Sequence, residues 1–419
     1  MTGSARIVRG NALALPLDDS TVDLVVTSPP YFGLRSYQDG GEHYDGQIGA
    51  EATPAEFVDA LIAATREMVR VVKPSGSIWV NLGDKYASSS TPGPQSANST
   101  MTGGAHKGVS NIAQRPLGTD GVKQKSLLGI PWRYAIRCID DLGLILRAEV
   151  IWSKPNGLPE SVTDRVRRSH ETWFHFTKMP RYFSAVDEIR EAHAQRTIDQ
   201  HKIDVRAGLG DSGSGFRGLG AKGRRERSST PEHNPLGKLP GSVWTIATQP
   251  LTVPAHLGID HFAAFPMEWP RRIIRGWSPA GVCVECGEGR RPVAEQDRTS
   301  REALRPAYGA GNHGTGGSTL GPRGVVAFIT GYACACPDTT APTTPGVVLD
   351  PFGGTGTTAL VAKVLGRHAV SVDMSADYCR LATWRTTDPD QIARAMQVDK
   401  PARQVAGQAD LFDHLEAAP

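Results

Sequence analysis

One stretch near the C-terminal end constrains the fold more than any other: GVVLDPFGGTGTTALVAKVLGRHAVSVDMS, residues 346–375. An apolar run is followed by a glycine-rich turn and a helical segment, and a second apolar run ends at Asp373. Two parallel strands cannot be joined by a tight turn, because they need a crossover connection that is usually a helix. This order of segments therefore predicts a β-α-β unit.

The rest of the chain continues this alternation. Strands are predicted at 22–26, 76–86 and 144–156, and helices at 54–72, 126–143 and 267–276. Thr53 followed by Pro54 is typical of a helix N-terminus. Alternating strands and helices predict an α/β fold, with a doubly wound, mostly parallel sheet of the Rossmann-like kind.

The glycine-rich turn predicts a ligand site. Gly354, Gly356 and Ala359 match the pattern G-x-G-x-x-A, in which glycines let the backbone approach a ligand closely. An acid at the end of the second strand, here Asp373, can accept hydrogen bonds from ribose hydroxyls. The structural alternative is a tight turn without a ligand. With the acid in place, the loop favours an adenosine-containing ligand and leaves open whether this is NAD or S-adenosylmethionine.

A second unusual feature lies near the N-terminus, where the apolar run 22–26 ends in TSPPY, residues 27–31. Proline has no N–H and a fixed φ, so Pro29-Pro30 predicts a stiff, extended corner that ends the strand. The corner carries a hydroxyl at Ser28 and an aromatic ring at Tyr31. A plain turn is the structural alternative to a functional role.

Together, the TSPPY corner and the loop DPFGGTG (350–356) resemble the DNA amino-methyltransferases, which methylate N4 of cytosine or N6 of adenine. The segments GQIG (46–49), WSKPNGLPES with His170-Glu171, and HFAAFP (261–266) occur in that family's usual order. The corner precedes the glycine loop in the chain, which is similar to the permuted β group. The resemblance covers most of the chain and implies methyl transfer from S-adenosylmethionine to a base flipped out of double-stranded DNA.

The resemblance also implies residue roles. Ser28 and the carbonyl of Pro29 would accept hydrogen bonds from the exocyclic amine, Pro30 would keep the corner rigid, and Tyr31 would stack on the base. The cofactor site would comprise Asp350, Phe352, Gly354, Gly356, Asp373, Phe265, Pro266 and Asn11. At the position of Asn11 many relatives have an acid, which puts its role in doubt. Two roles are possible for Asp84: it would line the target-base pocket, or it would be a structural turn residue at the end of a strand.

Ser28, in place of the aspartate of the DPPY form, favours cytosine N4, with adenine N6 as the alternative. Two other classes stay open: an NAD-dependent oxidoreductase, and a zinc-ribbon DNA-binding protein with an inactive methyltransferase core. Intact Ser28, Pro29, Pro30 and Tyr31 argue against the second.

A basic segment follows His170-Glu171. Residues 201–240 hold eight Lys or Arg and four acids, whereas the whole chain has a formal net charge of only +3. Its position resembles the family's target-recognition region, and basic side chains there would contact DNA phosphates or guanine edges. The candidate DNA-binding residues are Arg217, Lys222, Arg224, Arg225 and Arg227. A solvated loop that becomes ordered on DNA is compatible with both interpretations.

The six cysteines include two close pairs, Cys283 with Cys286 and Cys334 with Cys336. Thiolate pairs at such spacings can bind one tetrahedral Zn²⁺, so a structural zinc in a zinc-ribbon-like insert is predicted. Free thiols in a surface insert are the alternative.

The chain is thus divided by prediction into five regions. These are a catalytic region (residues 1–185) with a mobile loop 87–125, a target-recognition insert 186–242, a cofactor-binding region (243–280 and 340–390), a cysteine-bearing insert 281–339, and a flexible tail 391–419. No segment predicts a membrane span or signal peptide, so we expect a cytoplasmic, nucleoid-associated protein. Gln408–Phe412 resembles a sliding-clamp peptide, and a cognate restriction endonuclease is a further expected partner.

Overall fold

We analysed a computed structural model of the 419-residue chain. The structure describes residues 3–33, 38–39, 42–43, 46–87, 121–157, 159–193, 234, 236–259, 264–297, 326–337 and 340–399.

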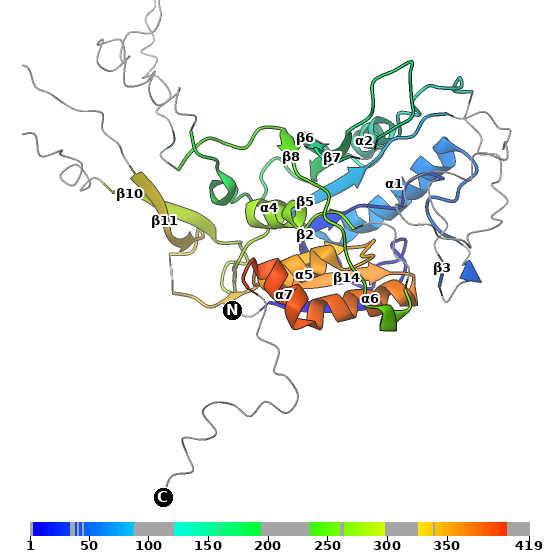
Figure 1. Ribbon diagram of the computed structural model, residues 1–419. Coiled ribbons are helices and arrows are strands. Elements are labelled where there is room, and N and C mark those ends of the chain that lie inside the picture. The colour runs from blue at the N-terminus through cyan, green and yellow to red at the C-terminus, as the bar shows by residue number, and fades with distance from the viewer. Residues whose placement is uncertain are drawn as a thin grey trace, which may run out of the picture.

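A central sheet of eight strands organises the chain (Figure 1). Its order is β1-β14-β13-β2-β5-β7-β6-β8. The bounds are β1 Ser4–Arg9, β2 Val22–Thr27, β5 Val72–Leu82, β6 Ile145–Ser153, β7 His170–Thr177, β8 Val243–Thr245, β13 Val347–Asp350 and β14 His368–Asp373. All pairs are parallel except those that β7 makes with β5 and β6, which are antiparallel. The predicted mostly parallel α/β sheet is therefore confirmed.

Helices cover both faces of this sheet. Their bounds are α1 Pro54–Val71, α2 Ile130–Asp140, α4 Glu268–Trp277, α5 Thr357–Val364, α6 Ala376–Thr387 and α7 Pro389–Met396, with 3₁₀ turns η1 Val186–Ile189 and η3 Ala255–Leu257. Short two-stranded pairs are β3 Gln38–Asp39 with β4 Glu42–His43, β9 Val282–Cys283 with β12 Thr343–Thr344, and β10 Arg291–Asp297 with β11 Val326–Ala333. None of the described helices has the length and apolar character needed to cross a membrane.

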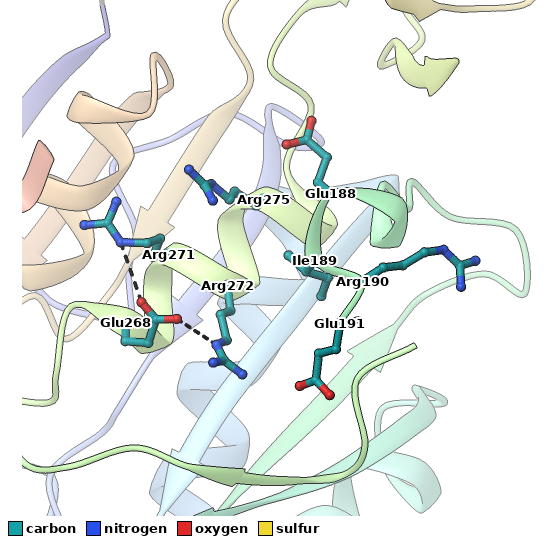
Figure 2. A pocket seen from close by; sticks show the side chains of 8 residues that line it. All are labelled: Glu188, Ile189, Arg190, Glu191, Glu268, Arg271, Arg272 and Arg275. Atoms are coloured by element: carbon teal, nitrogen blue, oxygen red, sulfur yellow. Dashed lines mark hydrogen bonds and ion pairs between the residues drawn. The ribbon is translucent and has the colours of Figure 1, made fainter. Parts of the chain in front are cut away.

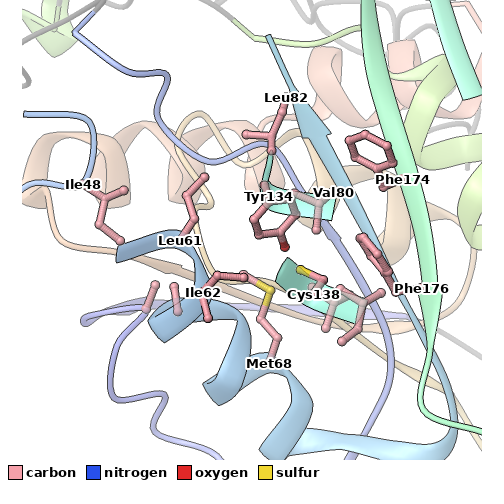
Figure 3. Close-up of a cluster of buried hydrophobic side chains, with 14 of the residues drawn as sticks. Ile48, Leu61, Ile62, Met68, Val80, Leu82, Tyr134, Cys138, Phe174 and Phe176 are labelled. Atoms are coloured by element: carbon pink, nitrogen blue, oxygen red, sulfur yellow. The ribbon is translucent and has the colours of Figure 1, made fainter. Parts of the chain in front are cut away.

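The core has two layers because side chains alternate across each strand. On β5, Val80 and Leu82 face α1 and α2, where they pack with Phe174 and Phe176 of β7 (Figure 3). Trp79 belongs to the opposite layer, which contains residues of α4 and α5. That layer is rich in tryptophan; the rings of Trp173 and Trp269, for example, stack with centroids 4.9 Å apart.

Helix α1 begins where the sequence predicts. The Thr53 hydroxyl accepts a hydrogen bond from the backbone N–H of Glu56, and the Glu56 carboxylate accepts one from the N–H of Thr53. This capping box satisfies two N–H groups that have no partner inside the helix.

Helix α2 begins at Ile130, later than the predicted 126. Gly129 has φ +72°, a left-handed conformation that ends the preceding turn, and Pro131 then occupies the first turn. The Asp84 carboxylate accepts hydrogen bonds from the N–H groups of Gly129 and Ile130, each at 3.1 Å. Of the two roles left open for Asp84, these contacts match the structural one, because they cap α2.

The C-terminal portion holds more structure than the sequence predicts. Helix α7 includes residues 391–396 of the expected tail, and the Asp388 side chain caps it by accepting a hydrogen bond from the N–H of Gln391.

Strand β7, in the middle of the chain, was not predicted either, because its polar ends interrupt the apolar run.

The order of the strands places the two sequence features side by side. Val348 and Leu349 of β13 pair in parallel with Leu24 and Val25 of β2. The carboxyl ends of these strands, which carry the glycine loop and the TSPPY corner, therefore meet at one edge of the sheet, where open α/β sheets bind their ligands.

Candidate active site

Asp350 joins the two motifs directly. Its Oδ1 accepts a hydrogen bond of 2.7 Å from the hydroxyl of Thr27, the residue before Ser28, and one of 3.2 Å from the N–H of Phe352. Its Oδ2 accepts a bond of 2.8 Å from the hydroxyl of Thr358 on α5. Asp350 is 1% exposed, so these bonds replace water. Burial raises the pKa of Asp350 to about 6, although the hydroxyl donors oppose this shift.

The corner itself is held by Asn81, at the end of β5. The hydroxyls of Ser28 and Tyr31 both donate to Asn81 Oδ1, at 3.2 and 2.7 Å. The Asn81 amide nitrogen donates to the backbone oxygen of Thr172, which fixes the amide orientation because two oxygens would repel there. The Ser28 hydrogen is thus directed at Asn81, and the lone pairs of Ser28 Oγ remain acceptors.

Glu171 holds the far side of the corner. Its Oε2 accepts a hydrogen bond of 2.7 Å from the Tyr31 hydroxyl, and its Oε1 forms an ion pair with Lys154. The Lys154 ammonium also lies 4.2 Å from the ring centroid of Trp152. Since Tyr31 has one phenolic hydrogen, Asn81 and Glu171 share a single donor. Neither the role of Asn81 nor that of Glu171 was predicted.

Glycines allow the corner to be enclosed closely. A Cβ on Gly83 would lie 2.6 Å from the ring of Tyr31, so only glycine permits this ring to pack on the end of β5. Gly49, at φ +102°, also packs closely against the corner. A Cβ on Gly49 would lie 3.1 Å from the Tyr31 backbone oxygen. The N–H of Gly33 also donates to the Gly49 oxygen at 2.8 Å. The contact of Gly49 explains why the GQIG segment (46–49) accompanies the corner.

The glycines of the cofactor-type loop have different roles. A Cβ on Gly353 would overlap the Ser371 hydroxyl at 1.9 Å, and one on Gly356 would meet Ala382 at 2.8 Å. Gly354 has φ +47°. A Cβ on Gly354 would have the Phe352 backbone oxygen as its nearest neighbour, at 3.9 Å. Gly353 and Gly356 are therefore required by packing, whereas Gly354 borders open space where a ligand has room. The sequence predicts the cofactor at this loop.

Asp373, the predicted ribose acceptor, lies at the carboxyl end of β14. Its two carboxylate oxygens accept hydrogen bonds from the N–H groups of Gly354, at 2.8 Å, and Ser375, at 2.9 Å. Asn11 lies beside it, after β1, where the N–H of Gly10 donates to the Asp373 backbone oxygen. The Asn11 side chain accepts from the N–H of Leu13 and so forms a local turn.

Phe265 and Pro266 lie directly before α4. The Phe265 ring packs edge-on against Trp173, with centroids 5.8 Å apart. The far end of α4 reaches the opposite edge of the sheet, where Arg367 donates to the Ser278 oxygen just before β14. The Phe265–Pro266 turn is therefore at the edge that carries the corner and the glycine loop.

Three of the four cysteines that were predicted to bind zinc lie close together. The sulfur atoms of Cys283, Cys286 and Cys334 lie within 4.8 Å of one another, while Cys336 is not in this cluster. The N–H groups of Cys286 and Glu285 donate to Cys283 and lower the pKa of its thiol to about 7. Thiolates are the form that binds metal, so the three sulfur atoms form a group that could hold a metal ion.

A cavity of about 190 Å³ lies away from these residues, between η1 and α4 (Figure 2). It is lined by Glu188, Ile189, Arg190, Glu191, Glu268, Arg271, Arg272 and Arg275. Glu268 pairs with Arg272 at 2.7 Å and with Arg271 at 3.7 Å, so much of this charge is compensated internally. It contains no residue of the corner or the glycine loop.

Several predicted residues lie outside the described portion of the chain. These are the candidate DNA-binding residues Arg217, Lys222, Arg224, Arg225 and Arg227, the clamp-like peptide Gln408–Phe412, and most of the loop 87–125. Their assignments stay predictions.

A doubly wound sheet with a glycine loop and a polar corner at one carboxyl edge is the arrangement expected of the Rossmann-like methyltransferase class. The family model for DNA methylases of the N6 and N4 type matches residues 22–284 and 340–383, more than half of the chain. The chain therefore belongs to the S-adenosylmethionine-dependent DNA amino-methyltransferases, as the sequence motifs predict.

The chain is also similar to named type II methyltransferases. The chain is 34% identical over 284 residues to the type II methyltransferase M.Cfr9I of Citrobacter freundii, covering 67% of this chain and 75% of the relative. It is 29% identical over 384 residues to M.SmaI of Serratia marcescens, covering 91% and 90%. Among solved structures, PvuII DNA methyltransferase (cytosine-N4-specific) aligns over 95% of this chain and 94% of its own, with 17% identity and a TM-score of 0.49.

Proposed function

We propose that this protein methylates N4 of cytosine at a specific site in double-stranded DNA. The observation that most supports methylation of an exocyclic amine, the class of target to which cytosine N4 belongs, is the pair of acceptors at the corner, Ser28 Oγ and the Pro29 carbonyl. An exocyclic amine has two hydrogens and a lone pair delocalised into the ring. Two fixed acceptors would bind both hydrogens and favour a tetrahedral nitrogen, whose lone pair can attack. Such preorganised groups contribute a few kcal/mol to barrier reduction.

The cofactor in this proposal is S-adenosylmethionine, whose sulfonium supplies an electrophilic methyl group when bound. The open space at Gly354 and the carboxylate of Asp373 fit its adenosine moiety. Asp350 would keep the glycine loop and the corner in register, so that the amine held by Ser28 faces the methyl group. The N–C bond would form as the C–S bond of the sulfonium breaks, which would leave S-adenosylhomocysteine, and the proton lost from the nitrogen would pass to water. Tyr31 would support the base by stacking.

Ser28 is the reason to favour cytosine. It replaces the aspartate of the DPPY form, and the SPPY form is commoner among the cytosine N4 enzymes that the chain resembles. Adenine N6 is the alternative, with the same acceptors. Digestion of DNA methylated in vitro to nucleosides, followed by mass spectrometry, distinguishes the products. N6-methyladenine as the sole modified base would overturn the cytosine assignment, and no methyl transfer to any DNA would overturn the enzymatic one.

The segment 186–242 is proposed to recognise the target sequence, with its Lys and Arg side chains contacting DNA. The relatives M.SmaI and M.Cfr9I are named as type II methyltransferases, which supports a cognate restriction endonuclease as a partner. Neutralising Arg224, Arg225 and Arg227 together should weaken DNA binding and reduce its salt dependence. A single exposed substitution elsewhere, such as Arg380→Gln, is the control.

A structural zinc ion is proposed at Cys283, Cys286 and Cys334. The donor set supports it, because three sulfurs converge and backbone N–H groups favour the thiolate form of Cys283. Metal analysis of the purified protein should give about one zinc per chain. No bound zinc after purification without chelator, with thiols kept reduced, would contradict it.

A further inference from the structure

A buried arginine behind the glycine loop has no role in the chemistry described so far. Arg385 of α6 is 3% exposed. Its Nη1 donates to the hydroxyls of Thr355 and Thr357, at 2.8 and 2.6 Å, and lies 3.4 Å from the Thr355 backbone oxygen. These threonines flank Gly356, at the junction of the loop and α5. The long side chain therefore fixes the end of the loop from behind.

Among the described residues, no carboxylate forms an ion pair with Arg385, and its buried Nε has no hydrogen-bond partner. Burial lowers its pKa to about 10, so the guanidinium is still protonated at neutral pH. Buried charges are normally paired, because their desolvation is costly. An arginine that only anchored two hydroxyls could be replaced by a neutral side chain.

The two ends of the loop thus differ in charge. At one end, the carboxylate of Asp373 accepts the N–H of Gly354. At the other, Arg385 lies behind Thr355 and Thr357, where the N-terminus of α5 adds the positive end of its dipole. A ligand with one anionic group would orient that group away from Asp373 and toward Arg385.

We propose that Arg385 is a positioning residue for the cofactor, which draws the carboxylate of S-adenosylmethionine to the Thr355–Thr357 end of the loop. This rests on the proposed function only in that the loop binds S-adenosylmethionine. The ribose would then lie toward Asp373, and the sulfonium between them would be directed at the corner. The arginine acts through the loop and touches no reacting atom.

The test compares two ligands that differ in the charged group. S-adenosylhomocysteine carries the carboxylate, and 5′-methylthioadenosine lacks the whole amino-acid moiety. Calorimetry measures the affinity for each ligand. Arg385→Gln should weaken the binding of S-adenosylhomocysteine at least tenfold, about 1.4 kcal/mol, and should change the affinity for methylthioadenosine less than threefold. Arg385→Lys retains the charge, so this variant should still bind S-adenosylhomocysteine more tightly than methylthioadenosine, by nearly the same factor as the unaltered protein. Arg380→Gln, an exposed arginine on the same helix that pairs with Asp377, should change neither affinity.

An equal loss for both ligands would overturn the proposal, since it would show that Arg385 only supports the loop. A second measurement on the unaltered protein covers the case in which Arg385→Gln does not fold. The unaltered protein should bind S-adenosylhomocysteine at least tenfold more tightly than the analogue in which the carboxylate is replaced by a carboxamide. Equal binding of the two ligands would overturn the proposal. If the unaltered protein binds none of these ligands, the proposed cofactor itself is wrong, which is a distinguishable result.

Discussion

The hydroxyl of Thr27 donates a buried hydrogen bond of 2.7 Å to the carboxylate of Asp350, which lies 323 residues further along the chain. This single contact joins the strand that ends in the proposed catalytic corner to the strand that ends in the glycine loop. The relative position of the two motifs therefore depends on a side-chain bond as well as on the pairing of β2 with β13.

Replacing Thr27 with Val should destabilise the protein by about 1–3 kcal/mol, because a buried carboxylate oxygen loses its hydroxyl donor. Urea unfolding measures this change. Thr21→Val removes an exposed hydroxyl that bonds the Asp18 oxygen, and should cost less than about 0.5 kcal/mol. Equal effects of the two substitutions would show that the Thr27–Asp350 bond is unimportant.

Ser28→Ala should lower kcat on the order of 10²-fold, similar to the loss of one preorganised hydrogen-bonding group elsewhere. Cofactor affinity should change little, because Ser28 lies outside the glycine loop. Single-turnover methylation and calorimetry with S-adenosylhomocysteine measure the two quantities separately. A parallel loss of turnover and affinity would contradict the assigned role, and Ser4→Ala is an exposed control.

Asn81 is expected to act through Ser28, which makes the two substitutions non-additive. Asn81→Ala alone should lower kcat about tenfold, since the Ser28 hydroxyl can then rotate and present its hydrogen to the amine. In a Ser28→Ala background the same change should have little further effect on kcat, because the Tyr31 hydroxyl, which also bonds Asn81, keeps Glu171 as an acceptor. Fully multiplicative losses in this double-mutant cycle would exclude the coupling.

Asp350→Asn should change how stability depends on pH. The folded-state pKa of Asp350 is raised to about 6 from an unfolded value near 3.9, so the native state binds this proton more tightly. The stability that this proton contributes is fully present below about pH 4 and lost as pH rises through 6. Asparagine keeps an acceptor for Thr27 and cannot titrate.

Relative to wild type, Asp350→Asn should therefore gain on the order of 2 kcal/mol between pH 4 and pH 7. Unfolding curves at several pH values give this difference directly. A constant difference across the range would mean that Asp350 does not titrate there.

The cysteine cluster can be tested through stability. If zinc is bound, Cys283→Ser should lower Tm and bound zinc together, and a strong chelator should do the same to the wild type. Cys336→Ser is the matched control, because Cys336 lies outside the cluster and should change neither. A loss of zinc in Cys336→Ser equal to that in Cys283→Ser would instead favour the four-cysteine site predicted from the sequence.

The sequence predicts those features of the site that depend on local patterns. The glycine loop, Asp373 and the stiff corner each follow from a few neighbouring residues, and the structure contains all of them at one sheet edge. Asn81 and Glu171 could not be assigned in this way, because they contact Tyr31 across 50 and 140 residues of chain. Glu171 does belong to a segment that resembles the family, but the segment alone does not indicate what the side chain contacts.

Other differences have equally physical causes. Arg385 gave no signal, since an arginine late in a helix usually faces solvent. Asp84 follows a strand as a site residue would, yet its carboxylate caps α2. The cysteine spacing suggested two equivalent pairs, whereas the fold after β11 brings only Cys334 to the cluster.

The pairing of β2 with β13 also bears on how the protein is made in the cell. The corner ends at Tyr31, but its neighbour in the sheet and the loop that completes the site follow only after residue 346. A ribosome must therefore add more than 300 residues after the corner before the two strands can pair. A product whose synthesis stops within that interval carries the corner and lacks the cofactor loop.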